Sequence, residues 1–185
     1  MIRQVSASAL VVALLAVGAT GCCSKLFKGS GGDSGTTSTG ANTPGEITKI
    51  DAAGVQFNAP GGWTKYGVGE WVRFKSPSGD AMLGFVPYTG DATSKIGDIA
   101  QQFGMLGSPK WNGGTVPSGP YGVFKGSEAN GTCALPNLPN VEIRYALVDT
   151  GSNTKLLLVY LAAQNASNAK NKKDIQAAVS TLRKI

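Results

Sequence analysis

The sequence predicts an α+β fold, an antiparallel β-sheet covered by helices, in residues 46–185. This stretch has the length of one ordinary domain and is long enough to bury a hydrophobic core without disulfides. Its apolar patterns follow the order three strands, helix, three strands, helix. Because turn residues join neighbouring strands, antiparallel pairing is favoured.

The first three strands are predicted at 54–60, 71–75 and 82–86. In the first of them, Val55 and Phe57 lie on one face, and the third is continuously apolar. Residues 76–80 read Ser-Pro-Ser-Gly-Asp, which is typical of a turn. The second and third strands are therefore expected to form a hairpin.

A short amphipathic helix is predicted next. Its apolar residues recur at helical spacing and are Ile96, Ile99, Ala100 and Phe103. Asp91, Thr93 and Ser94 are candidate N-terminal caps, and the helix is expected to end near Gly104. Residues 107–120 are rich in Gly and Pro and are predicted to form a long loop.

The second group of strands is predicted at 121–128, 141–148 and 156–162. Residues 130–140 are expected to be a loop, and 149–154 a hairpin turn. The chain then closes with an amphipathic helix whose apolar stripe consists of Ile175, Ala178, Val179, Leu182 and Ile185. Arg183 and Lys184 are expected near the C-terminus of this helix, where the helix dipole favours cations.

The N-terminus has the order of a bacterial export signal. Arg3 precedes an apolar run at 9–17, which is about half the roughly 20 residues that a membrane span requires. Small residues then lead to Cys22. The sequence Ala-Thr-Gly-Cys ending at Cys22 resembles the lipobox of bacterial lipoproteins, although Leu is usual where this chain has Ala19.

The lipobox resemblance implies cleavage before Cys22, followed by attachment of a diacylglyceryl thioether and an N-acyl chain to this cysteine. Two or more acyl chains anchor a protein stably to a membrane. Residues 1–21 are then a signal peptide, and residues 22–45, rich in Gly, Ser and Thr, are the lipidated cysteine and a flexible linker. Lipidation of Cys23, secretion without lipid and an uncleaved anchor are the alternatives.

This resemblance also implies a location. The protein is expected to be lipid-anchored in the bacterial cell membrane or outer membrane, facing the periplasm or the exterior. Its partners are then the membrane, through the anchor, and an envelope protein. Nucleic acid is not expected as a partner of a lipid-anchored domain outside the cytoplasm, although the net charge is +6. The oligomeric state is left open.

A second resemblance covers most of residues 46–185. A strand ending near Phe57, the segment Pro-Gly-Gly-Trp at 60–63, a hairpin, a helix, further strands and a terminal helix resemble the PsbP-like fold, which lipoproteins of the DcrB type share. The resemblance implies an α-β-α sandwich. Members of this fold mostly act as non-enzymatic accessory, assembly or binding subunits, so it implies no substrate and no catalytic residue.

Two motifs resemble those of enzymes. Residues 146–152, Ala-Leu-Val-Asp-Thr-Gly-Ser, resemble the catalytic loop of aspartic proteases around Asp149. Too few residues follow for the closing strands of such a subunit, and there is no second copy, so we interpret the segment as a hairpin turn. Ser-x-x-Lys occurs at 152–155 and 167–170, but the other motifs of penicillin-recognising enzymes are missing and we attribute both matches to chance.

The chain contains no histidine. This removes the usual general base, the Ser-His and Cys-His nucleophile pairs and the commonest zinc ligand. The carboxylates are scattered, without the spacing of a calcium loop. We therefore expect no catalytic residue, no metal and no cofactor, and a protein that is not an enzyme. Two carboxylates that meet only in the folded chain are the open alternative.

Lysines and cysteines allow more than one interpretation. Lys170, Lys172 and Lys173 form the densest basic cluster, which is either a solvated face or a surface attracted to anionic headgroups or cell-wall polymers. Cys133 is either a free buried thiol or paired with Cys23.

Trp63 and Trp71 are predicted to lie in the core. Trp111 lies in the predicted loop at 107–120, beside Lys110, and these two residues are the candidate partner contacts because aromatic residues on loops make good anchors. The alternative is that Trp111 clamps its loop onto the domain. Together the observations predict a membrane-anchored accessory or protein-binding domain. A small-molecule or lipid-binding domain, with an apolar cavity between sheet and helices, is the second hypothesis.

Overall fold

The computed structural model of the chain describes residues 45–185. The predictions that concern the signal peptide, Cys22, Cys23 and all of the linker before Gly45 therefore lie outside the described residues.

The described residues form eleven strands, three α-helices and one 3-10 helix. In chain order these are β1 (Ile47–Ile50), η1 (Asp51–Ala53), β2 (Val55–Asn58), β3 (Thr64–Tyr66), β4 (Val72–Lys75), β5 (Ala81–Thr89), α1 (Thr93–Gly97), α2 (Ile99–Gln102), β6 (Lys110–Trp111), β7 (Val116–Tyr121), β8 (Phe124–Leu135), β9 (Leu138–Asp149), β10 (Thr154–Ala163), α3 (Asn168–Ser180) and β11 (Arg183–Lys184).

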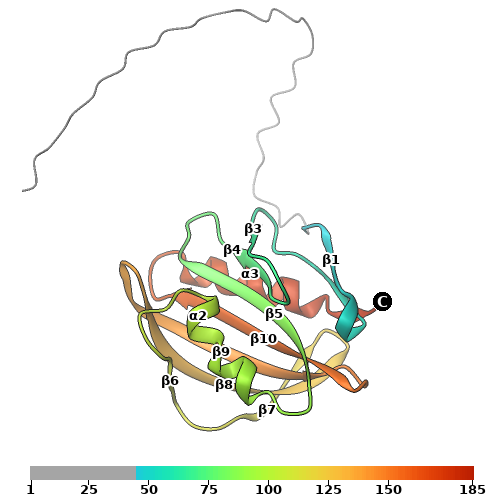
Figure 1. Ribbon diagram of the computed structural model, residues 1–185. Helices are drawn as coiled ribbons and strands as arrows, with labels where there is room; N and C mark the ends of the chain where they lie inside the picture. The colour runs from blue at the N-terminus through green and yellow to red at the C-terminus, as the bar shows by residue number, and fades with distance from the viewer. Residues whose placement is uncertain (1–44) are drawn as a thin grey trace, which may run out of the picture. The chain divides into compact units, whose positions relative to one another are not determined.

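The strands form two antiparallel sheets (Figure 1). In the main sheet the order is β3-β4-β5-β10-β9-β8, and the outer edge of β8 pairs with both β6 and β7. A small sheet has the order β1-β2-β11 and so joins the two ends of the described chain. The predicted hairpins β4–β5 and β9–β10 are both present.

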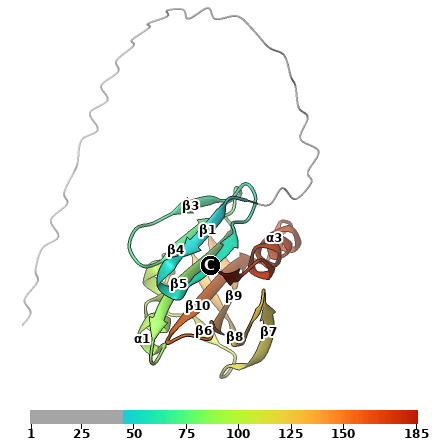
Figure 2. The ribbon, with the colours of Figure 1, turned by 90° about the vertical axis from the view of Figure 1, so that its right-hand side faces the viewer.

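Helices lie on both faces of the main sheet: α3 on one side, α1 and α2 on the other (Figure 2). The core on the α3 side includes Phe57, Phe85, Leu158 and Ile175. The core on the opposite side includes Trp71, Ile99, Phe103, Leu157 and Leu161. Each long central strand supplies both cores, because successive side chains of a strand point to opposite faces.

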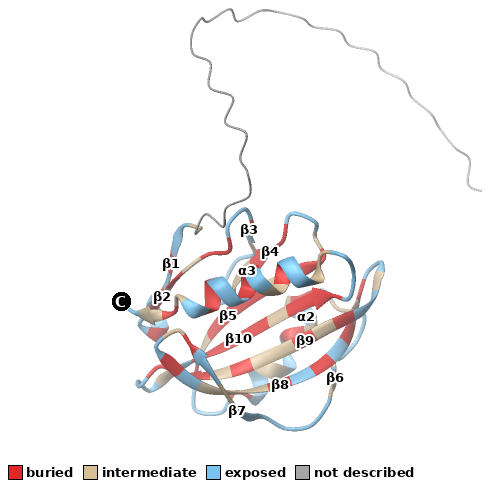
Figure 3. Cartoon of the chain, turned by 180° about the vertical axis from the view of Figure 1, so that it is seen from behind, coloured by how far each residue is buried: buried red, intermediate tan, exposed pale blue. Residues whose placement is uncertain are grey.

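The predicted fold class is confirmed in part. The sheet is antiparallel and carries helices, but these helices cover only a portion of it. Figure 3 shows α3 lying across β5 and β10, while the outer part of β8 and β9 has exposed and half-buried residues on the same side. On the other side, α1 and α2 contain only five and four residues.

The prediction for the terminal helix is wrong at its end. The helix stops at Ser180, and Arg183 and Lys184 form β11 beside β2, so they are not last-turn residues of a helix. Thr181 explains the change of direction. Its hydroxyl donates to the carbonyl of Ala178 at 2.6 Å and accepts from the backbone N–H of Asn58 at 2.8 Å, which ties the helix end to β2.

Two predicted loops are also wrong. Residues 107–120 include β6 and most of β7, and residues 130–140 belong mainly to β8 and β9. Cys133 consequently lies in a strand, where it is buried, and burial raises the pKa of its thiol to about 11. The predicted helix at 96–103 is present as two short pieces, α1 and α2, on either side of Asp98.

The predictions for two tryptophans are confirmed, because Trp63 and Trp71 are 8% and 6% exposed. None of the helices in residues 45–185 combines the length and the apolar character that crossing a membrane requires.

Candidate functional site

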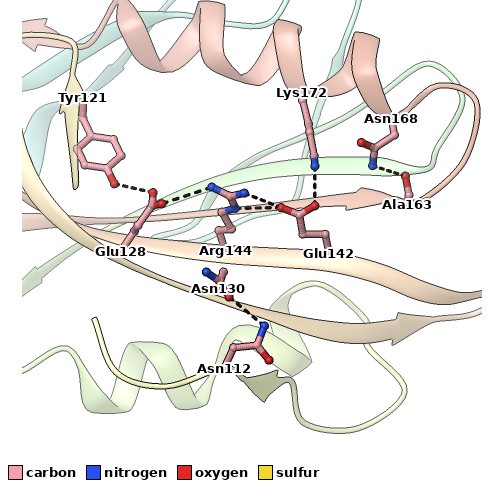
Figure 4. Close-up of polar contacts among 9 residues, drawn as sticks. All are labelled: Asn112, Tyr121, Glu128, Asn130, Glu142, Arg144, Ala163, Asn168 and Lys172. Atoms are coloured by element: carbon pink, nitrogen blue, oxygen red, sulfur yellow. Dashed lines mark hydrogen bonds and ion pairs between the residues drawn. The ribbon is translucent and has the colours of Figure 1, made fainter. Parts of the chain in front are cut away.

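The most distinctive polar surface of the described chain lies on the α3 side of β8 and β9. We call it the polar face (Figure 4). Its residues are Glu128, Asn130 and Thr132 of β8, Glu142 and Arg144 of β9, Lys172 of α3, Tyr121 of β7, Lys110 of β6, and Asn112 directly after β6.

Strand periodicity produces this surface. In β8 the exposed residues Asn130 and Thr132 alternate with buried Ala129, Gly131 and Cys133. In β9 half-buried Glu142 and Arg144 alternate with Val141 and Ile143, which are fully buried. Since side chains alternate between the two faces of a strand, one face of this part of the sheet is apolar and packed, and the other is polar and open.

Cross-strand register aligns the residues that β6, β8 and β9 contribute to the polar face. Thr132 lies opposite Glu142 on one side and Lys110 on the other. Directly opposed residues of antiparallel strands point to the same face, so Lys110 is on the same side of the sheet as Glu142. Asn112 lies beside Asn130, and its side-chain amide donates to Asn130 Oδ1 at 2.9 Å.

Among the residues that the structure describes, ion pairs connect four of the five charged residues of the polar face, all except Lys110. The Nε and Nη2 atoms of Arg144 are each 2.9 Å from Glu142 Oε1, and its Nη1 atom is 3.4 Å from Glu128 Oε1. Lys172 Nζ is 2.6 Å from Glu142 Oε2 and thus links α3 to the sheet. Arg144 therefore lies between two carboxylates, and positive and negative groups alternate across the face.

Two tyrosines complete the network. Tyr121 donates its hydroxyl to Glu128 Oε2 at 2.9 Å. Burial, which outweighs a hydrogen bond from Ser118, and the nearby Glu128 carboxylate raise the pKa of Tyr121 to about 12, so its hydroxyl stays protonated and remains a donor. The Arg144 guanidinium lies 5.8 Å from the centre of the Tyr160 ring, an arrangement in which cation and ring attract one another.

The surroundings of Glu142 and Arg144 keep both side chains charged. Partial burial tends to raise the pKa of Glu142, but hydrogen bonds and charges from Lys172 and Arg144 prevail and lower it. Partial burial tends to lower the pKa of Arg144, but Tyr160, Glu142 and Glu128 prevail and raise it. Glu142 is therefore held ionised at neutral pH, which suits binding and makes it a poor general acid.

The structure separates the two candidate partner contacts. Lys110 is exposed and belongs to the polar face. Trp111 lies on the opposite face, is half-buried, and packs edge-on against Tyr145 with ring centres 4.7 Å apart. Trp111 thus holds β6 onto the sheet, as in the alternative that the sequence left open, and Lys110 is displayed beside the ion pairs.

The segment around Asp149 is a hairpin turn between β9 and β10, as interpreted. Asp149 Oδ1 accepts from the Gly151 N–H at 3.0 Å, and the Thr150 and Ser152 hydroxyls both lie within 2.7 Å of the Thr154 carbonyl oxygen. A shallow cleft of about 430 Å³ separates this turn from residues 52–54 and Lys184. The polar atoms of the turn are engaged with one another, which is what a structural turn requires.

Among residues 45–185, no three His, Cys, Asp or Glu side chains come together in a way that fits a metal ion.

From the sequence, Glu128 and Glu142 were only two of several scattered carboxylates, and Arg144 was not a candidate residue. A local signal was present: Glu142 and Arg144 are two residues apart in a predicted strand and therefore share a face. The pairing with Glu128 and Lys172 depends on the strand register and on where α3 packs, and neither is encoded locally.

Comparison with known proteins supports the fold. No family model matches the chain, and no curated protein matches it either. The solution structure of cyanobacterial PsbP (CyanoP) from Synechocystis sp. PCC 6803 aligns with a TM-score of 0.50 at 12% identity, covering 82% of this chain and 98% of that one.

Two further structures are similar to a lesser degree. The first is a point mutant of the protein Mog1, which aligns with a TM-score of 0.47 at 13% identity and covers 77% of this chain and 97% of that one. The second is the Saccharomyces cerevisiae Ran-binding protein Mog1p, which aligns with a TM-score of 0.45 at 14% identity and covers 77% of this chain and 96% of that one. Identities this low show the fold alone. The described chain therefore has the PsbP-like α+β fold that the sequence predicted.

Proposed function

We propose that this chain is a non-enzymatic accessory lipoprotein of the bacterial envelope, anchored through Cys22, whose domain binds a protein partner through the polar face. The observation that carries the proposal is the open sheet surface formed by β8 and β9, with a preformed network of charged side chains on it. Preorganised polar groups give a binding surface specificity at a low ordering cost.

The chemistry of the face favours binding over catalysis. Glu128 and Glu142 are both engaged with Arg144, and the low pKa of Glu142 removes it as a proton donor at neutral pH. The chain offers no histidine to act in their place. These features support an accessory role, as the PsbP-like resemblance also implies.

The second hypothesis, a small-molecule or lipid-binding domain, requires an apolar cavity between sheet and helices. Within the described residues, the two spaces where sheet and helices meet are occupied by buried side chains, among them Leu158 and Ile175 on one face and Leu157 and Ile99 on the other. The cleft beside Lys184 is lined mostly by polar turn residues and small side chains, which suits a lipid chain poorly. No observation favours this hypothesis over the first.

Two tryptophan substitutions on β8 test the proposed function. Asn130→Trp places a bulky side chain in the middle of the polar face, and Lys125→Trp places one on the opposite face of the same strand. Both positions are exposed. The full chain is extracted from its native membranes in mild detergent, and the size of its complex is measured by native electrophoresis.

The proposal predicts that the wild type and Lys125→Trp migrate as a complex with a second protein, and that Asn130→Trp migrates as the free chain. Thermal unfolding of the three proteins shows that the variants are folded. A complex that survives Asn130→Trp and is lost in Lys125→Trp contradicts the proposal, as does a wild type that migrates alone.

A further inference from the structure

On the polar face every carboxylate oxygen already has a donor partner, whereas the cations keep N–H donors that have no polar partner within residues 45–185. Glu142 Oε1 faces Arg144 and Oε2 faces Lys172. Likewise Glu128 Oε1 faces Arg144, and Oε2 accepts from Tyr121. The acids of the face are thus the groups with least to offer an incoming molecule.

The cations have more to offer. An arginine carries five N–H donors, and three nitrogen atoms of Arg144 are in contact with Glu142 and Glu128, so N–H groups remain on its two terminal nitrogens. Lys172 has three donors and contacts only Glu142 within the described chain. Lys110 is exposed and makes neither an ion pair nor a side-chain hydrogen bond with another residue of the 45–185 segment.

These free donors are arranged around one strip of sheet. Lys110 lies on β6 at one border, Lys172 on α3 at the other, and Arg144 on the floor between them. The face carries three cations against two carboxylates. Partial exposure, 34% for the Arg144 side chain and 39% for that of Lys172, leaves both within reach of a second molecule.

We propose that the polar face recognises a protein segment bearing carboxylate side chains, which lies along β8 and β9 and pairs with Lys110, Arg144 and Lys172. This inference rests on the proposed function and adds the chemical class of the partner. Charge-assisted hydrogen bonds from Arg and Lys to carboxylates are among the stronger polar contacts. The arginine is also held by Glu128 and Glu142, so little further ordering is needed when it binds.

The partial burial of two of the three cations favours a peptide over a lipid surface. Arg144 lies on the sheet between α3 and β7, with Lys172 and Tyr121 coming from these two flanking elements (Figure 4). Arg144 and Lys172 are both partly buried, with 34% and 39% of their side chains exposed, and a carboxylate on a flexible protein side chain can approach such donors one at a time. The anionic source that fits is therefore an acidic stretch of protein.

Peptide binding tests the inference with the full lipidated chain in phosphatidylcholine nanodiscs. The probe is a fluorescent ten-residue peptide of alternating Glu and Ser, and a Gln–Ser peptide of equal length is the neutral control. We expect the acidic peptide to bind and added salt to lower its affinity by screening the charges. The neutral peptide is expected to bind at least about tenfold more weakly.

Matched variants locate the binding. Lys110→Glu reverses an exposed charge on the polar face, and Lys155→Glu makes the same change at an exposed position that shares the other face with Tyr88. Lys110→Glu is expected to weaken acidic-peptide binding by about tenfold or more, and Lys155→Glu by less than about twofold. Lys110→Gln removes the charge without reversing it and is expected to give an intermediate loss of affinity. Such a graded loss shows that the effect of Lys110→Glu does not come from misfolding.

Three results overturn the inference, and each is distinct from failure of the proposed function. Equal, salt-insensitive binding of both peptides shows that carboxylates are not recognised. If phosphatidylglycerol vesicles displace the acidic peptide from the wild type, and this displacement is lost in Lys110→Glu, the face binds lipid headgroups. Absence of binding by the acidic peptide, with the Asn130→Trp effect on the native complex intact, shows that the face binds a partner of another class.

Discussion

Asp80 shows how single residues hold this domain together. Its side chain is 6% exposed, and it accepts hydrogen bonds from Ser76, Ser78, Asn165 and Asn171. Burial tends to raise the pKa of Asp80, but these four donors prevail and lower it to about 2. A buried charge with this many donors connects the β4–β5 turn to the start of α3.

We predict that Asp80→Asn lowers the free energy of unfolding by about 2 kcal/mol, because the neutral amide accepts less strongly and its NH₂ group faces other donors. The measurement is urea unfolding at neutral pH. Asp98→Asn, at an exposed carboxyl, is the control and is expected to stay within about 0.5 kcal/mol of the wild type. Equal effects of the two substitutions would refute this role for Asp80.

The same residue gives stability a defined dependence on pH. The pKa of Asp80 is about 2 in the folded chain and close to 3.9 in the unfolded chain, so its contribution is complete above about pH 4 and is lost as the pH falls toward 2. The wild type should lose about 2 kcal/mol more than Asp80→Asn over this interval. Parallel curves for the two proteins would show that Asp80 does not titrate in this way.

At the scale of elements, α3 is attached to the sheet by polar contacts as well as by its apolar stripe. Trp63 donates its indole N–H to Asp174 at 3.3 Å, Lys172 pairs with Glu142, and Asn171 donates to Asp80. Asp174 is buried and also accepts from Lys170 at 2.6 Å. These contacts fix where α3 crosses the sheet, and so fix one border of the polar face.

A double-mutant cycle between Trp63→Phe and Asp174→Ala measures this attachment. Because the indole is the partner of a buried carboxylate, we expect an interaction energy of about 0.5–1.5 kcal/mol in the free energy of unfolding. Trp71→Phe combined with Asp174→Ala is the control, since Trp71 is also buried but packs against Phe103 on the other face. Additive Trp63 and Asp174 effects would show that the hydrogen bond does not hold α3.

Elements with clear periodicity were predictable from sequence, and the others depend on contacts distant in the chain. The strands β5, β9 and β10 and most of α3 follow from their apolar patterns. The strands β6 and β7 have no such pattern. Gly131 permits β6 to pair, because a Cβ there would lie 2.4 Å from the Lys110 carbonyl oxygen, and a Cβ at Gly126 would lie 3.0 Å from the Tyr121 ring.

The end of α3 could not be read from its sequence for a similar reason. Leu182 continues the apolar stripe of the helix and is buried, so the pattern alone extends the helix past Ser180. In the structure, Leu182 is buried although it lies after the end of the helix, because Arg183 and Lys184 pair with Gln56 and Val55 of β2. Tertiary pairing overrides local helical preference here.

In the whole molecule, the polar face is assembled from five elements of the chain, β6, β7, β8, β9 and α3. Lys110 was a sequence candidate, whereas Arg144 and its partners were recognisable only once β6, β8, β9 and α3 were in place. The absence of histidine from the sequence led to the expectation of a binding role, which stays a prediction. The strand register and the packing of α3 determine which residues form the polar face.

The membrane anchor is the other whole-molecule prediction, and it rests on residues 1–22. We expect the mature chain from native membranes to begin at Cys22 and to carry acyl chains, and Cys22→Ala to lose both the lipid and membrane association. Intact mass spectrometry of both proteins provides the test, with Cys23→Ala as the matched control. An unmodified chain in the membrane fraction would contradict lipidation.

Site-specific photo-crosslinking in the cell shows whether the polar face contacts a protein partner. A photoreactive phenylalanine is placed at Asn130 or Thr132 on the polar face, and at Lys125 or Asp98 elsewhere, all four being exposed. If the polar face is the binding surface, a covalent adduct with a second protein forms at Asn130 and Thr132 and none forms at the other two positions. Adducts only at Lys125 or Asp98, or none at any position, would contradict the proposed function.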